Sequence, residues 1–367
     1  MKKTLIVALI LALPVIAVAA TDERERSVES FEQLQKVELE KYYYGGATNG
    51  EIPKTPMAIE MYNQAVLFFE QGEYSMAKEA ALESLQLEAR NPMALELLGE
   101  IANLKQDFAA AREYYKKSYL LSASPRVREK LEKLSKEELI ENKLDTYEDE
   151  HFTIKYQRDD PRYEGYEIRN ILRDSYRAVS QDLGFYINNK IVVLFYEADE
   201  FRYITAQPHY IGGVYDGKIR LPAYRKGFNE QDLKATVTHE MTHAFVSYLS
   251  NLRAPAWIQE GLAEYEENKV RPADLSALKA AVKAKTLMPI EQFFLLNINS
   301  NLQPKELELF YQRAFSFTSY LVKRFGMYRI KEILRQFGKG DDSFAAIEEV
   351  LKISPERLEK TWLATFK

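Results

Sequence analysis

The chain has no cysteine among its 367 residues, and it has only four histidines and two tryptophans. Without thiols it can form no disulfide, no thiolate metal site and no lipid anchor on cysteine. A fold of this length must then be stabilised by its apolar core, for which 46% hydrophobic residues supply ample material. The length is sufficient for two or three domains.

A surface rich in positive charge is also lacking. The 50 Lys and Arg residues are outnumbered by 55 Asp and Glu residues, which gives a formal net charge of −5. The basic residues are dispersed along the chain and form no cluster. We therefore expect neither nucleic acid nor anionic lipid as the main partner.

Only one long apolar run is present, from Leu5 to Ala20, and it follows Lys2 and Lys3. Because this run ends in small residues of the A-x-A type, residues 1–20 are predicted to be a signal peptide that is removed on export. The alternative is an uncleaved membrane anchor, although the run is short for a spanning helix. We expect an exported protein, periplasmic or extracellular, with no stable membrane insertion after signal removal. Loss of the two lysines takes the net charge from −5 to −7.

A charged segment that ends in several glycines, residues 21–52, is predicted to be a linker. Residues 53–143 are rich in Ala and Leu at helical spacing, and they repeat: Tyr74 and Phe108 begin similar segments 34 residues apart. This segment resembles tetratricopeptide repeats and predicts an all-α domain of two units. Such stacks offer a concave surface to a peptide or protein partner, and a purely packing or spacer role is the alternative.

Two of the four histidines occur in the motif His239-Glu240-Met241-Thr242-His243. No Gly or Pro interrupts residues 232–253, and apolar residues recur there at helical spacing, so we predict a helix. Residues four apart lie one above the other on a helix, which directs both imidazoles to one point. Glu240 projects beside them, where a general base can take a proton from a metal-bound water.

A third metal ligand is predicted on a second helix, in the segment Trp257-Ile258-Gln259-Glu260-Gly261. Glu260 follows His243 by 17 residues, which is enough for the first helix to end and the chain to return antiparallel. Three protein ligands and one open position are typical of catalytic zinc, whereas a fourth protein ligand would indicate a structural site. We therefore predict Zn²⁺ held by His239, His243 and Glu260.

The second helix continues with further acidic residues. Glu264 lies four residues after Glu260 on the same helical face, and we predict that it accepts the free N–H of a ligating histidine and fixes its tautomer. The alternative is that Glu264 belongs to a solvated acidic face. We expect Glu266 and Glu267 to form such a solvated face.

The HEMTH motif followed by W-I-Q-E-G-L-A-E-Y resembles the gluzincin metallopeptidases, specifically the bacterial peptidase MA-like group and, more distantly, the zinc aminopeptidases. The resemblance covers roughly residues 145–367 and implies Glu260 as the third zinc ligand. It also implies that Tyr311, at the start of Y-Q-R-A-F-S-F-T-S-Y-L, stabilises the tetrahedral intermediate by donating to the oxyanion. Alternatively, Tyr311 packs within an aromatic helix. The G-x-M-E-N segment of the aminopeptidases has no counterpart, so exopeptidase specificity is not implied.

The segment 145–367 is predicted to be α+β, a zincin-like metallopeptidase domain with a small mixed sheet and a mainly helical C-terminal part. The predicted sheet elements are strands 151–156 and 190–196 with a helix between them at 162–183, and a hairpin over 212–222 that turns at Asp216-Gly217. The resemblance implies that the strand directly before the HExxH helix is the sheet edge that borders the cleft and binds extended substrate.

These features favour a zinc-dependent peptidase that hydrolyses peptide bonds in the bacterial envelope, with Glu240 as general base on zinc-bound water and a peptide or protein as substrate. The alternative is a non-catalytic envelope scaffold that binds protein partners through its helical repeats and has a structural or vestigial metal site. The presence of Glu240 favours the enzyme over the scaffold, because the three ligands alone would be enough to hold a structural ion.

Overall fold

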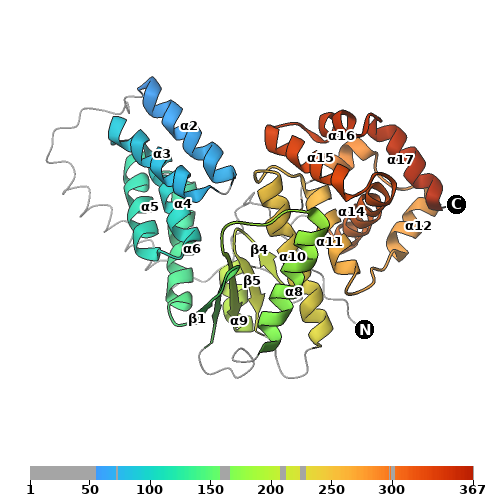
Figure 1. Cartoon of the computed structure of the whole chain (residues 1–367), viewed down its shortest axis with the longest axis horizontal. Coiled ribbons are helices and arrows are strands. Elements are labelled where there is room, and N and C mark those ends of the chain that lie inside the picture. Colours follow the sequence, from blue (N-terminus) through green and yellow to red (C-terminus); the bar gives the residue numbers. More distant parts are fainter. Residues whose placement is uncertain are drawn as a thin grey trace. The chain divides into compact units, whose positions relative to one another are not determined.

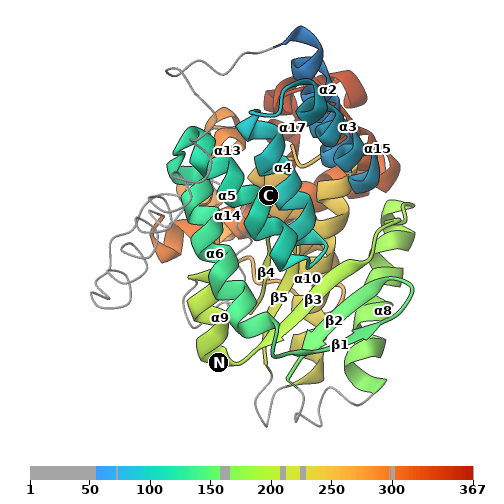
Figure 2. The same cartoon turned by 90° about the vertical axis from the view of Figure 1, so that its left-hand side faces the viewer.

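The structure, a computed structural model, describes residues 55–71, 73–157, 166–206, 212–223, 229–296, 298 and 302–366. The predicted signal peptide and linker lie outside the described residues. The described chain forms two compact units, and Figures 1 and 2 show their elements. One, the helical unit, comprises residues 55–69 and 73–138; the other, the sheet unit, comprises residues from 139 onward together with 70–71.

The helical unit consists of helices joined by short turns. The helices are α2 (Pro56–Glu70), α3 (Tyr74–Leu87), α4 (Pro92–Leu104), α5 (Phe108–Ser122) and α6 (Pro125–Glu141). Local sequence explains where these helices begin: Asn91 caps α4 by accepting from the backbone N–H of Met93 and Ala94, and Asp107 caps α5 through Ala110. Small residues then allow close packing, since a Cβ at Gly99 would lie 2.5 Å from the Tyr115 ring.

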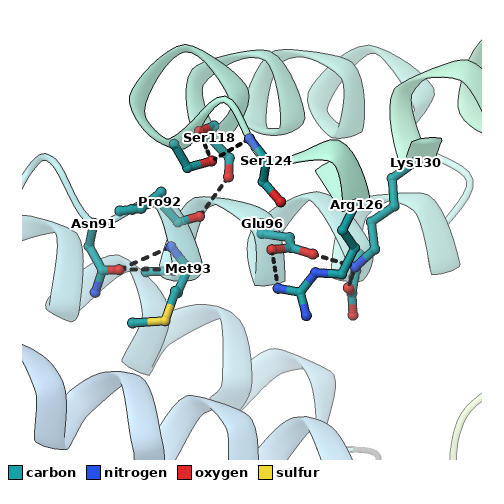
Figure 3. Close-up of polar contacts among 11 residues, drawn as sticks. Asn91, Pro92, Met93, Glu96, Ser118, Ser124, Arg126 and Lys130 are labelled. Carbon is teal, nitrogen blue, oxygen red and sulfur yellow. Dashed lines mark hydrogen bonds and ion pairs between the residues drawn. The ribbon is translucent and has the colours of Figure 1, made fainter. Parts of the chain in front are cut away.

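Polar contacts join neighbouring helices within the helical unit (Figure 3). Ser118 on α5 donates to the carbonyl of Pro92 at 2.7 Å. Glu96 on α4 is only 6% exposed and accepts from Arg126 and Lys130 of α6 at 2.7 and 2.6 Å. The buried charge of Glu96 is thus balanced inside the unit, which favours a structural role for this cluster.

The sheet unit contains a small mixed sheet, as the sequence predicts, and its strand order is β1-β2-β3-β5-β4. The strands are β1 (Asp145–Glu148), β2 (Phe152–Tyr156), β3 (Ile191–Tyr196), β4 (Val214–Tyr215) and β5 (Ile219–Pro222). The pairs β2–β3 and β3–β5 are parallel, and the pairs β1–β2 and β5–β4 are antiparallel.

The hairpin forms at Asp216-Gly217, where Gly217 adopts a φ of +94°. β5, the strand that directly precedes the HExxH helix and ends at Pro222, is not the edge of the described sheet, because it lies between β3 and β4. The turn folds β4 back along the outside of β5, so β4 is the edge strand. Our expectation that the last strand before this helix is the edge was therefore wrong.

Two layers of helices cover the sheet. On one face, α8 (Tyr166–Leu183) and α10 (Glu230–Leu249) bury an apolar core that includes Val193, Phe195 and Leu221. On the other face, α9 (Ala198–Thr205) packs in a second core with Leu194 and Tyr196. All six residues of β3 are buried, as expected for the central strand of a covered sheet.

The C-terminal part is helical, as predicted. Its helices are α11 (Ala256–Asn268), α12 (Ser276–Ala284), α13 (Ile290–Leu295), α14 (Pro304–Phe325), α15 (Met327–Lys339), α16 (Ser343–Leu351) and α17 (Pro355–Leu363), followed by a 3-10 turn at Ala364–Phe366. None of the helices in the described residues combines the length and apolar composition that a membrane span needs.

Candidate metal centre

Helix α10 supplies the two histidines. Asn229 caps its start by accepting a hydrogen bond from the backbone N–H of Gln231 at 2.9 Å. The acidic residues of the first turn stabilise the helix by interacting with the positive end of its dipole. His239 and His243 are 0% and 2% exposed. A helix that is buried on nearly all sides fixes the direction of both imidazoles before any ligand binds.

Helix α11 supplies Glu260. A turn with positive φ at Asn251 and Leu252 reverses the chain after α10. Buried Trp257 then anchors the first turn of α11, where its Nε1 donates to the Ser343 hydroxyl at 2.9 Å. Gly261 lies against α14: a Cβ there would come within 2.7 Å of the Ala314 carbonyl. This close approach sets the position of the neighbouring Glu260.

The three predicted ligands converge. Glu260 Oε2 lies 3.4 Å from His239 Nε2 and 3.6 Å from His243 Nε2, and the ligand atoms of all three residues lie within 4.8 Å of one another. A tetrahedral zinc ion with bonds of 2.0–2.1 Å separates its ligand atoms by about 3.3–3.4 Å. These spacings are too long for good hydrogen bonds and match ligands around one cation.

The same atoms are buried without hydrogen-bond partners among the described residues. This holds for Nε2 of His239 and His243 and for both carboxylate oxygens of Glu260. Buried polar atoms of folded proteins are nearly always paired, so each such atom needs an explanation. A divalent cation would satisfy all of them at once, and the residues present therefore fit zinc.

Glu240 lies beside this cluster and is 0% exposed. Both of its carboxylate oxygens are buried without a hydrogen-bond partner in the described part of the chain. Burial raises the pKa of Glu240 to about 7, against the opposing charge of His239 and His243. A carboxylate with a pKa near neutrality can both accept and release a proton at physiological pH.

Each histidine is oriented from behind by a different acceptor. His239 Nδ1 lies 2.9 Å from Glu267 Oε2, and His243 Nδ1 lies 3.2 Å from Gln259 Oε1. Donation from Nδ1 leaves Nε2 of each ring as the metal-binding nitrogen. The predicted acceptor, Glu264, is not the residue that makes this contact with His239; Glu267 makes it instead.

The physical reason is that a salt bridge with Arg271 fixes Glu267 in place. Glu264 and Glu267 follow Glu260 by four and seven residues and share its face. Glu267 is held toward His239 because Arg271 binds its other oxygen and also binds Asp232 of α10 at 3.1 Å. Arg271 is thus the signal in the sequence that distinguishes Glu267.

The charges of these two carboxyl groups differ accordingly. Burial would raise the pKa of Glu267, but His239 and Arg271 outweigh it and hold that pKa below its usual range. Burial, and next the charge of Glu267, raise the pKa of Glu264 to about 8. For His239, burial lowers the pKa, but the carboxylates of Glu260 and Glu267 outweigh this and hold it well above its usual range.

The prediction of a solvated face at Glu266 and Glu267 was wrong. They are 1% and 6% exposed. Glu266 pairs with Lys269 at 2.7 Å, and burial raises its pKa to about 7. The cause is the close packing of α11 between α10 and α14, which leaves little of its surface to solvent.

Tyr311 lies on α14 and is 5% exposed. It packs in the second core together with Val214 and Leu307. Val214 directly follows Gly213, whose backbone lies against Glu240. Tyr311 therefore lies in the same core as the strand that begins beside Glu240. Its role toward substrate stays a prediction.

Comparison with known families agrees with this arrangement over part of the chain. Residues 225–367 match the model of the Peptidase MA superfamily. The match includes α10, α11 and α14 and supports a peptidase MA-like domain, whereas the strands β1 to β5 precede it. No curated protein matches the chain.

Proposed function

We propose that the protein is a zinc-dependent peptidase of the gluzincin type. One observation supports this most strongly: the buried ligand atoms of His239, His243 and Glu260 lie at zinc-ligand spacing beside the buried carboxylate of Glu240, and none of these atoms has a hydrogen-bond partner within the described residues. The similarity of residues 225–367 to the Peptidase MA superfamily agrees with hydrolysis of peptide bonds.

Bound zinc would lower the pKa of a coordinated water to about 7 and polarise the carbonyl of the substrate. Glu240 accepts the proton of the attacking water and returns it to the leaving amine. Tyr311 donates to the oxyanion of the tetrahedral intermediate.

The remaining polar residues around the centre act on the ligands. Glu267 and Gln259 hold the rings of His239 and His243 with Nε2 toward the metal. Arg271 fixes Glu267 in turn. These residues orient the site without contacting the substrate.

Export, the helical repeats and the extent of the peptidase domain are part of the same proposal. The protein is exported by residues 1–20 and acts on peptides or proteins in the envelope. The helices of residues 53–143 form tetratricopeptide-like repeats that either bind a protein partner or act as a spacer. Residues 145–367 form the peptidase domain.

The test compares the purified, zinc-loaded protein with the same protein after chelation, using fluorescently labelled denatured casein as substrate. We expect cleavage that stops with chelator and returns when one equivalent of zinc is restored. A protein that binds one zinc per chain and cleaves neither casein nor any peptide of a mixed library would instead favour the scaffold, with a structural or vestigial metal site.

A further inference from the structure

The backbone of Gly213 lies directly against the side chain of Glu240. A Cβ built on Gly213 would come 2.9 Å from Glu240 Cγ and 3.0 Å from its Oε1, and 3.0 Å from Leu221 Cδ2. Ordinary van der Waals contacts of a Cβ are 3.4–4 Å. The residue at position 213 must therefore lack a side chain for Glu240 to lie where it does.

Shape, and not hydrogen bonding, sets the position of this carboxylate. Neither oxygen of Glu240 has a hydrogen-bond partner among the described residues, and the side chain is 0% exposed. Its place is thus determined by the surfaces around it, and the backbone of Gly213 is one of them. A methyl group added to that surface acts on Glu240 directly.

The strand after Gly213 is fixed on both sides, so it has little freedom to retreat. Val214 is buried in the core on one face of the sheet, and Tyr215 packs against the core on the other face, which includes residues of α10. β4 is also paired with β5, with Val214 opposite Arg220 and Tyr215 opposite Ile219. A methyl group at position 213 would accordingly displace the side chain of Glu240 more readily than the strand.

We propose that Gly213 is a positioning residue for Glu240: it leaves the space in which the carboxylate lies in reach of the attacking water. This inference rests on the proposed function. A contact of 2.9 Å must lengthen by about 0.5–1 Å to become ordinary, and a misplacement of about 1 Å in a reacting group can lower a rate by about 10²-fold. Gly213→Ala should therefore lower kcat by about 10- to 100-fold.

The experiment measures zinc content, kcat and KM of the full-length Gly213→Ala protein on labelled denatured casein, together with Glu240→Gln and the double variant Gly213→Ala/Glu240→Gln. We expect one zinc per chain, a lower kcat, and a KM within about threefold of wild type. Because the glycine acts through Glu240, its substitution should cause no further loss when Glu240 is already Gln. Should Gly213→Ala fail to fold, Leu221→Ala is added to remove the other close contact, with Leu221→Ala alone as control.

Three results would overturn the proposal. A Gly213→Ala protein with wild-type kcat shows that Glu240 tolerates the methyl group. An equal loss in the Glu240→Gln background shows a general structural effect. In both cases the proposed function stands as long as wild type is active and Glu240→Gln is not. A wild-type protein that binds zinc and cleaves nothing removes the proposed function and this inference together.

Discussion

His239 Nδ1 lies 2.9 Å from Glu267 Oε2, which makes Glu267 the carboxylate that orients the first imidazole of the candidate metal site. Glu264, which the helical spacing also favours, does not make this contact. Residues that orient a ligating histidine typically change metal affinity 10- to 100-fold when they are mutated. We expect Glu267→Gln to weaken zinc binding by about that factor.

Glu264→Gln is the matched control, because it removes a carboxylate from the same helical face while keeping the contact between His239 and Glu267. Its zinc affinity should stay within a few-fold of wild type. Competition with a chromogenic chelator measures both variants. If Glu264→Gln weakened binding more than Glu267→Gln, the assignment of the orienting residue would be incorrect.

Glu240→Gln should separate metal binding from turnover. The amide has nearly the same shape but cannot accept the proton, so kcat should fall by about 10²- to 10⁴-fold, the usual contribution of a general base. Zinc content should stay at wild-type level, because Glu240 is not one of the three ligands. Steady-state kinetics and metal analysis of the same sample provide the check, and retained activity would exclude Glu240 as the base.

Zinc affinity should increase with pH across the neutral range. The carboxylates around His239 hold its pKa well above its usual range, so the metal-free protein keeps a proton on this ring at neutral pH. Zinc must displace that proton, and below the raised pKa the affinity should fall by about tenfold for each unit of falling pH. An ordinary histidine would give a nearly constant affinity above about pH 7.

Calorimetric titration of zinc in buffers of different ionisation enthalpy counts the protons released at each pH. We expect proton release on binding at pH 7, and less release as the pH rises past the raised pKa of His239. Binding that releases no proton at pH 7 would show that the ring of His239 is already neutral there.

Gly261→Ala should destabilise the helix pair around Glu260. The added Cβ would overlap Thr318 Oγ1 and would lie 2.7 Å from the Ala314 carbonyl oxygen of α14. Overpacking of this kind costs about 1–3 kcal/mol in the free energy of unfolding. Chemical denaturation of the metal-free protein measures this loss.

Thr318→Ala provides the control for that experiment. Combined with Gly261→Ala, it removes the Oγ1 contact but leaves the contacts with the Ala314 carbonyl and with the Cβ of residue 318, so the double variant should recover only part of the lost stability. Full recovery would show that the carbonyl of Ala314 yields without cost and that the helices are less closely constrained than the structure indicates.

Local patterns were sufficient to predict the three residues that converge. The spacing of His239 and His243 within one helix determines their common direction, and the distance to Glu260 allows a return helix. The mixed sheet could likewise be predicted, because alternating and continuous apolar runs depend on neighbouring residues alone. The histidine pair and the strands require only the periodicity of one element, and Glu260 requires in addition that the next helix returns antiparallel.

The features that could not be predicted depend on how separate elements meet. Glu264 and Glu267 share one face of α11, so only the rotation of this helix against α10, fixed by Gly261 and Arg271, decides which one reaches His239. The contact between Gly213 and Glu240 joins residues 27 positions apart in different elements. The interior place of β5 follows from strand order, which the local sequence does not specify.

The most direct test of the central claim is zinc stoichiometry combined with X-ray absorption spectroscopy at the zinc edge, on wild type and on Glu260→Ala. We expect one zinc per wild-type chain, bound by two imidazole nitrogens and by oxygen ligands at about 2.0–2.2 Å. Glu260→Ala should lose most of its zinc. One zinc per chain with an unchanged spectrum in Glu260→Ala would show that Glu260 is not a ligand.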